Sequence, residues 1–88
     1  MKKHNSFMFK KNFGHVLKGL REERNLSMKE LERISDIYDT QICRWERGDN
    51  MLSVQNLIIL ANVLDVSVDE ILTMCDEYEE KKDDQKSA

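Results

Sequence analysis

The 88 residues of this chain are enough for one small domain, and the composition favours helices. There is no proline, there are three glycines, and 40% of the residues are hydrophobic. No apolar run approaches the ~18 residues of a membrane span, no signal peptide is evident, and two cysteines make no disulfide framework. A reduced, cytoplasmic protein is expected.

Charge is divided unevenly along the chain. Residues 1–48 hold 11 Lys/Arg and 7 Asp/Glu, a charge of +4. Residues 49–88 hold 3 and 10, a charge of −7, and the halves sum to the net −3. A basic front half agrees with a polyanion-binding face, although charge runs also serve solubility alone.

Residues 1–12 contain four lysines and have no clear hydrophobic period. They are predicted to be a flexible basic arm. The arm is either a frayed end or a segment whose Lys10 and Lys11 contact DNA phosphates. A further alternative is that Phe7 and Phe9 cover the core or a partner.

The first regular pattern covers residues 13–24, where apolar side chains recur at i, i+3, i+4 and i+7. These side chains are Phe13, Val16, Leu17 and Leu20. The pattern predicts an amphipathic helix. Asn25 is a residue type that can end it in a left-handed conformation.

Two short helices separated by a tight turn follow. Ser27 and Glu30 form a capping-box pattern that begins the first, at 28–35. The second, Asp39–Arg47, is stopped by Gly48. Helices joined by so short a turn must cross steeply, which is the geometry of a helix-turn-helix.

The apolar residues of this helix pair are expected to face the core. They are Leu31, Ile34, Ile37, Ile42 and Trp45. For Trp45, packing in the core is favoured over stacking on a base. Cys43 is expected near the outward side, as a packed or exposed thiol rather than a redox switch.

Two more helices are predicted, at 54–64 after an N-cap serine and from residue 68 after a second capping box. Their core stripes are Val54, Leu57, Leu60, Ala61 and Leu64 in the first and Val68, Ile71, Leu72 and Cys75 in the second. The charged residues 76–88 either extend the last helix or are disordered. The expected organisation is therefore an arm at 1–12, a helical domain at 13–75 and a tail.

The chain from Phe13 to Leu72 resembles the helix-turn-helix domain of the lambdoid phage repressor and Cro group, also called the XRE family of regulators. The residues that carry the resemblance, with no gap, are Phe13-Gly14, Leu17, Leu20-Arg21, Leu26-Ser27, Leu31, Ile37, Ile42, Arg44-Trp45-Glu46-Arg47-Gly48, Ser53, Leu57, Leu60-Ala61, Leu64, Val66-Ser67 and Asp69-Glu70-Ile71-Leu72. The resemblance implies an all-α, compact, five-helix lambda-repressor-like domain whose third helix enters the DNA major groove. It also implies an inward ion pair between Arg21 and Glu46.

The sequence departs from the family pattern on the side expected to meet DNA. Met28 stands where the family has a glutamine that braces a phosphate contact. Glu32 replaces a packed alanine, and Asp36 replaces the glycine of the turn. Tyr38 stands where a serine or threonine caps the recognition helix, so Asp39 is expected to take over as the cap.

The outward side of the recognition helix supplies the candidates for base contacts, which are Asp39, Thr40, Gln41 and Arg44. Arg44 can pair bidentately with guanine, and Gln41 or Thr40 can read adenine or a thymine methyl. Asp39 either accepts a hydrogen bond from a cytosine amino group or caps the helix. The capping role is the favoured alternative.

Phosphate contacts position such a domain, and base contacts specify the sequence. The phosphate candidates are Lys29, Arg47 and Asn50, with Lys10 and Lys11 in addition. For Lys29, a solvated helix residue is an equal alternative.

A symmetric dimer with half-sites about one helical turn apart is expected, because one such domain buries too little surface for tight operator binding. Excess apolar side chains mark a candidate dimer seam. They are Leu52, Ile59, Val63, Met74 and Tyr78.

The predicted function is a sequence-specific transcriptional regulator, a repressor, that binds a palindromic operator in double-stranded DNA as a homodimer. The alternative is a protein-interaction module, such as an antitoxin or anti-repressor, with weak DNA binding. An enzyme is not expected, because His4 and His15 do not pair with either cysteine at metal-ligand spacing and no nucleophile has an evident base. No cofactor, metal or membrane contact is predicted.

Overall fold

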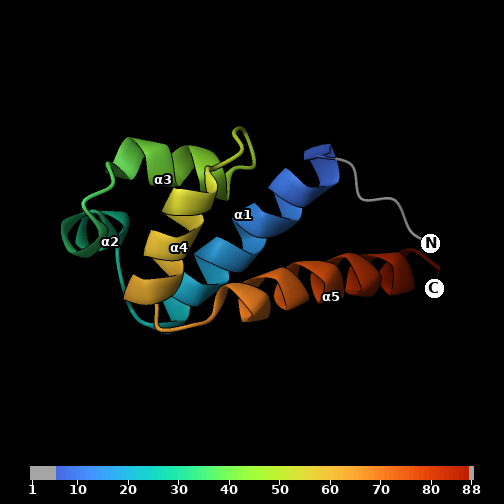
Figure 1. The fold of residues 1–88 in the computed structure, drawn as a ribbon. Coiled ribbons are helices and arrows are strands. Elements are labelled where there is room, and N and C mark those ends of the chain that lie inside the picture. The colour runs from blue at the N-terminus through green and yellow to red at the C-terminus, as the bar shows by residue number, and fades with distance from the viewer. Residues whose placement is uncertain (1–5, 88) are drawn as a thin grey trace.

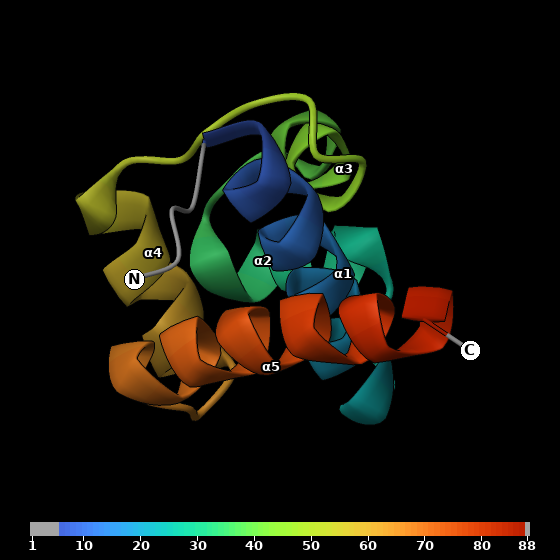
Figure 2. The same cartoon turned by 90° about the vertical axis from the view of Figure 1, so that its right-hand side faces the viewer.

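The computed structural model describes the backbone of residues 6–87 and the side chains of residues 8–78. Over these residues the chain is all-α. The helices are α1 (Ser6–Glu23), α2 (Met28–Ser35), α3 (Asp39–Glu46), α4 (Val54–Val63) and α5 (Val68–Ser87). Helix α3 lies along one side of the molecule and α5 along the opposite side, with α1 between them (Figures 1 and 2). None of the described helices is both long and apolar enough to cross a membrane.

Helix α1 begins at Ser6, seven residues before the predicted start. The boundary drawn at residue 12 between an arm and the domain was therefore wrong, and residues 6–12 are the first turns of α1. These turns are held by packing, because the Phe9 ring stacks on Phe13 at 6.2 Å and Asn12 is 2% exposed. Residues 1–5 lie outside the described part of the chain.

Helix α5 continues through the charged tail to Ser87. Residues 76–87 thus agree with the helix extension, one of the two alternatives, and residue 88 lies outside the described part of the chain. The tail lacks glycine and proline and is rich in glutamate and lysine, which favour helix.

Both predicted capping boxes are present. Ser27 Oγ accepts a hydrogen bond from the Glu30 amide at 3.0 Å, and the Ser27 amide donates to Glu30 Oε1 at 2.8 Å. The backbone hydrogen bond from Ser27 lowers the pKa of Glu30. Ser67 and Glu70 form the same pair of bonds at 2.9 and 3.0 Å. The sequence therefore determines where α2 and α5 begin.

Non-glycine residues in the left-handed region stand at three helix ends. Asn25, Asp36 and Asp65 have φ values of 56°, 62° and 58°. Asp36 occupies the turn position for which the family uses glycine, and its amide donates to the Glu32 carbonyl at 2.8 Å. Asparagine and aspartate tolerate this conformation better than most residues, so the turn forms without the glycine.

The core is built from all five helices. Its buried apolar residues are Phe13, Val16, Leu17, Leu20, Leu31, Ile42, Trp45, Leu60, Ala61, Leu64, Ile71 and Cys75. Most of them were expected from the hydrophobic periods.

Three residues predicted for the core are instead exposed: Ile34 (45%), Val54 (72%) and Leu72 (39%). In α2 the buried neighbour of Ile34 is Ser35, whose hydroxyl is satisfied by donating to the Leu31 carbonyl at 2.6 Å. Val54 is the first residue of α4 and precedes the first buried residue of that helix by more than one turn.

Two glycines of α1 differ sharply in what a side chain would meet. A Cβ on Gly14 would lie 2.6 Å from the carbonyl oxygens of both Trp45 and Glu46, whereas a Cβ on Gly19 would have no atom within 4 Å. Helix α1 can therefore approach α3 closely only at a glycine. Nothing in the fold requires the second glycine.

Alanine substitutions at these two positions should have opposite effects. Gly14→Ala should destabilise the protein by about 1–3 kcal/mol, because α1 and α3 must separate. Gly19→Ala should stabilise it by about 1 kcal/mol through helix propensity. Urea denaturation followed by circular dichroism measures both, and equal stability of the two variants would contradict the close approach at Gly14.

Candidate nucleic-acid interface

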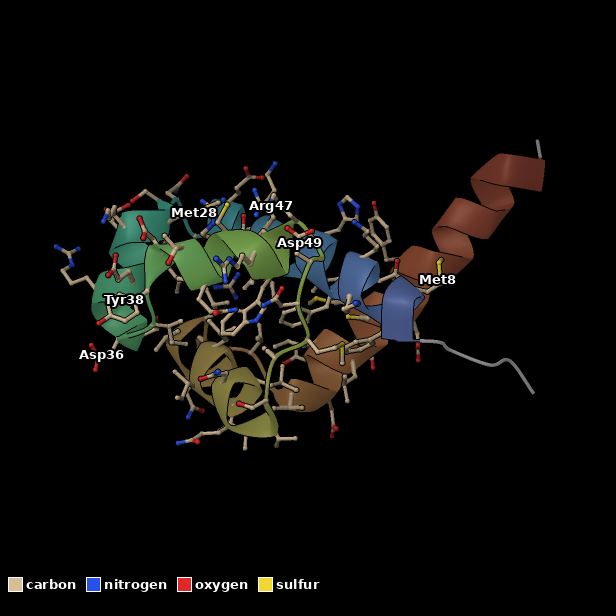
Figure 3. All side chains as sticks on the ribbon, turned by 90° about the horizontal axis from the view of Figure 1, so that it is seen from above. Met8, Met28, Asp36, Tyr38, Arg47 and Asp49 are labelled. Carbon is tan, nitrogen blue, oxygen red and sulfur yellow. The ribbon has the colours of Figure 1, made fainter. Side chains whose placement is uncertain are left out.

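Helix α3 presents one side to the core and the other to solvent. Ile42 and Trp45 are 0% and 2% exposed, so they fix the inward side. Thr40 and Arg44 are exposed on the opposite side, and Gln41 is half-buried. In Figure 3 this helix lies across the face of the molecule seen from above. The outward side chains are those that the hydrophobic phase predicts.

A bidentate ion pair ties α1 to α3. Arg21 Nε donates to Glu46 Oε2 at 2.6 Å, and Arg21 Nη2 donates to Glu46 Oε1 at 3.0 Å. The side chains are only 10% and 4% exposed, and a further bond joins Arg21 Nη1 to the Leu26 carbonyl at 2.7 Å. The hydrogen bond with Glu46 raises the pKa of Arg21. The pair implied by the family resemblance thus fixes the orientation of α3 on α1.

Two further bonds to helix ends, one from α1 and one from the residue that follows it, were not predicted from the sequence. Lys11 Nζ donates to the Arg47 carbonyl at 3.1 Å, at the end of α3. Arg24 Nε donates to the Leu64 carbonyl at 2.6 Å, at the end of α4. A cation at a helix C-terminus satisfies a free carbonyl and interacts favourably with the helix dipole. Lys11, assigned above to a DNA phosphate, therefore fastens α3 in this structure.

Replacing Lys11 with methionine should lower the free energy of unfolding by about 0.5–1.5 kcal/mol, because the hydrogen bond to the Arg47 carbonyl is lost while the apolar stem is kept. Lys18→Met is the matched control, since Lys18 lies exposed on the same helix. Chemical denaturation of both variants measures the difference. If Lys11→Met were as stable as the control, the bond to Arg47 would have no stabilising role.

Carboxylates accompany two of the cations expected to contact phosphates. Lys29 Nζ lies 3.2 Å from Asp39 Oδ2 and 3.5 Å from Glu32 Oε1. The hydrogen bond with Asp39 raises the pKa of Lys29. Arg47 Nε lies 3.0 Å from Asp49 Oδ2, and Figure 3 shows these two side chains together near the end of α3. Each of these cations is therefore already paired with a carboxylate in this structure, which lowers the positive potential around it.

The prediction that Asp39 caps α3 was wrong. The N-cap residue is Tyr38, no side chain makes the capping bond, and Asp39 is the first residue of the helix. Its carboxylate faces Lys29 on the neighbouring helix instead, because the turn brings the two helices within reach.

Arg44 is the cation of α3 whose guanidinium is not engaged by a carboxylate among the residues that the structure describes. Within the described part of the chain it is exposed and makes no salt bridge, unlike Lys29 and Arg47. Asn50 is also exposed, and Lys10 is half-buried.

The apolar residues proposed as a dimer seam are all half-buried. Leu52, Val63 and Met74 pack against the core of their own chain. The Tyr78 ring stacks on His15 at 4.8 Å. The large apolar residues that are more exposed are Ile34, Tyr38, Met51, Val54, Ile58 and Leu72. The seam remains a prediction.

The two cysteines have different surroundings. Cys75 is 3% exposed, and burial raises the pKa of its thiol to about 11, whereas Cys43 is half-buried on α3. In the part of the chain that the structure describes, no cluster of three or more His, Cys, Asp or Glu side chains is placed to hold a metal ion.

A thiol reagent at pH 8 should therefore modify Cys43 first. Cys75 should react only after unfolding, because its thiol is both buried and protonated at that pH. Mass spectrometry of the native protein should show one rapid adduct, and Cys43→Ser should remove it. Rapid double labelling of the native protein would contradict the burial of Cys75.

Comparison with known proteins identifies the family and the fold. Residues 17–71 match a family model described as helix-turn-helix. Two solved structures are 31% identical to the chain: the restriction-modification controller protein C.AhdI from Aeromonas hydrophila, with a TM-score of 0.68, and the S. venezulae BldD DNA-binding domain, with 0.66. They cover 70% and 72% of this chain, and the match spans 94% of each.

A third solved structure shows the same fold over more of the chain. The clp gene regulator ClgR from Corynebacterium glutamicum has a TM-score of 0.84 at 20% identity. The match covers 90% of this chain and 84% of the ClgR chain. At that identity the likeness concerns the fold alone. Among curated proteins, no sequence matches the chain significantly.

Proposed function

The chain belongs to the XRE/Cro-type helix-turn-helix family of DNA-binding transcriptional regulators, which are not enzymes, and on that premise we propose that it represses transcription by binding a palindromic operator as a homodimer. The observation that carries the proposal is the anchored helix α3, whose outward side offers the exposed Arg44. Among the similar proteins, C.AhdI is described as a restriction-modification controller protein and BldD by its DNA-binding domain.

In this proposal α3 enters the major groove and reads bases. The guanidinium of Arg44 pairs with the O6 and N7 atoms of a guanine. Thr40 and Gln41 lie one turn earlier on the same side and read an adenine or a thymine methyl. Asp39, at the start of the helix, accepts from a cytosine amino group when Lys29 turns to the backbone.

Phosphate contacts set the register of the helix in the groove. Arg47 and Asn50 stand at the end of α3 and in the loop after it, where the phosphate backbone passes. Lys29 stands at the other end, on α2. Contacts at both ends orient α3 along the groove, and the Arg21–Glu46 pair keeps that orientation fixed.

A second candidate function is a protein-interaction module with weak DNA binding, such as an antitoxin or anti-repressor. The ion pairs of Lys29 with Asp39 and of Arg47 with Asp49 favour it, because they lower the positive potential of the proposed DNA face. A stable complex with another protein and no sequence preference on DNA would distinguish this function from the first.

Selection of bound duplexes from a random DNA pool tests the proposal. The full chain is incubated with the pool at low ionic strength, and the bound duplexes are sequenced after several rounds. Recovery of an inverted repeat with half-sites about one helical turn apart supports a dimer that reads sequence. Recovery of no motif, together with binding that vanishes at physiological salt, would overturn the operator proposal and favour the interaction module.

A further inference from the structure

An open groove of about 320 Å³ lies between α1 and α5. Its floor is apolar, with Val16 and Leu20 from α1 and Met74 from α5. Figures 1 and 2 place α5 on the opposite side of α1 from α3. The groove therefore lies away from the helix that is proposed to meet DNA.

Gly19 lines the groove and gives it depth. A Cβ atom at this position would meet no atom within 4 Å, so the fold itself would accept alanine. Glycine inside a helix costs about 1 kcal/mol relative to alanine. The chain thus carries a destabilising residue whose structural effect is an open space in this groove.

Carboxylates stand at the rim. Glu23 from α1 and Glu77 from α5 line the groove, and both are exposed. The Glu23 side chain is 74% exposed and lies 3.4 Å from Arg24. Tyr78 also lines the groove, where its ring stacks on His15. An apolar floor between two carboxylates complements an apolar side chain flanked by lysine or arginine, and it repels a nucleic acid.

We infer that this groove docks a basic amphipathic helix of a partner protein. One apolar side chain of that helix occupies the space above Gly19, and basic side chains a turn away reach Glu23 and Glu77. Because the groove lies across α1 from α3, a docked partner leaves α3 uncovered. Met74 and Tyr78 also belong to the predicted dimer seam, so the partner helix and a second copy of the chain would exclude each other at these two residues. The inference does not depend on DNA binding, so its test can fail or succeed separately.

A display library of random helical peptides provides the probe, selected against the full chain. The expected result is enrichment of peptides that carry apolar residues at i, i+3 or i+4 spacing and an excess of lysine and arginine. One enriched peptide is then synthesised and titrated against the chain by fluorescence anisotropy. Amide shifts of Gly19, Met74 and Tyr78 in NMR spectra should locate it in the groove.

Three variants make the test specific. Gly19→Leu fills the groove and Glu77→Lys reverses its charge, and each should weaken the peptide by about tenfold or more. Glu22→Lys is the matched control, because Glu22 is exposed on α1 outside the groove, and it should leave affinity unchanged. Thermal unfolding verifies that each variant is folded.

Several outcomes would overturn the inference. They are enrichment of acidic or uncharged peptides, amide shifts confined to α3, or equal weakening by Glu22→Lys and Glu77→Lys. A different outcome is that no peptide is enriched, that the chain associates with itself, and that Gly19→Leu abolishes this association. The occupant of the groove would then be a second copy of the chain and not a partner helix.

Discussion

Replacing Glu46 with alanine should lower the free energy of unfolding by about 3–5 kcal/mol, because the Arg21 guanidinium would remain buried without its partner. The Glu46 side chain is 4% exposed and accepts two hydrogen bonds from Arg21. Urea denaturation monitored by circular dichroism measures the loss. Single domains typically have a total stability of about 5–15 kcal/mol, so this loss would be a large fraction of it.

The control for Glu46→Ala is Glu22→Ala, a change at an exposed acid next to Arg21 that should alter stability little. The double variant Arg21→Met with Glu46→Leu should recover much of the loss, since no unpaired charge stays buried. A loss below about 1 kcal/mol for Glu46→Ala would mean that the pair behaves like a surface salt bridge.

Replacing Arg44 with alanine should remove the sequence preference of the protein at one base pair in each half-site. A bidentate contact favours guanine over the other bases by about 1–3 kcal/mol. The binding free energy for the selected duplex should therefore weaken by that amount in each half-site. Fluorescence anisotropy with the selected duplex, and with duplexes altered at single positions, measures both effects.

Arg33→Ala provides the matched control for Arg44→Ala. Arg33 is exposed on α2, outside the proposed base-contact residues, and has the same charge. Its loss should weaken all duplexes slightly and equally. If Arg44→Ala weakened every duplex to the same degree as Arg33→Ala, Arg44 would serve as a phosphate contact instead.

Much of the fold follows from local patterns. The starts of α2 and α5 were predictable because Ser27 and Ser67 each bond a glutamate three residues later, a signal contained in four consecutive positions. The inward side of α3 was predictable because Ile42 and Trp45 are the large apolar residues of that helix and lie one turn apart.

The errors concern the start of one helix and the choice of buried residue in another. Helix α1 starts early because Phe9, four residues before Phe13, continues the apolar stripe that was predicted only from Phe13 onward. The burial of Asn12 has no such signal, because asparagine is polar. In α2, Ser35 replaces Ile34 in the interior because a serine hydroxyl can bond the carbonyl of the preceding turn. A hydrophobicity pattern ranks isoleucine above serine and cannot anticipate this.

The outward residues of the candidate site were predictable from the sequence, but the ion pairs and hydrogen bonds that they make were not. The phase of α3 is enough to place Arg44 outward. The ion pair of Lys29 with Asp39 joins two helices and depends on their crossing, and the bond from Lys11 to Arg47 joins residues 36 positions apart. Such contacts turned an expected cap and an expected phosphate ligand into parts of the scaffold.

The three attachments of α1 to α3 bear on when the third helix becomes ordered. With eight residues, α3 is too short to persist on its own. It is held by the Arg21 pair, by the close approach at Gly14 and by the Lys11 bond at its end. Its backbone amides should therefore exchange with solvent only when α1 also opens. A helix ordered in advance loses no conformational entropy when a ligand arrives.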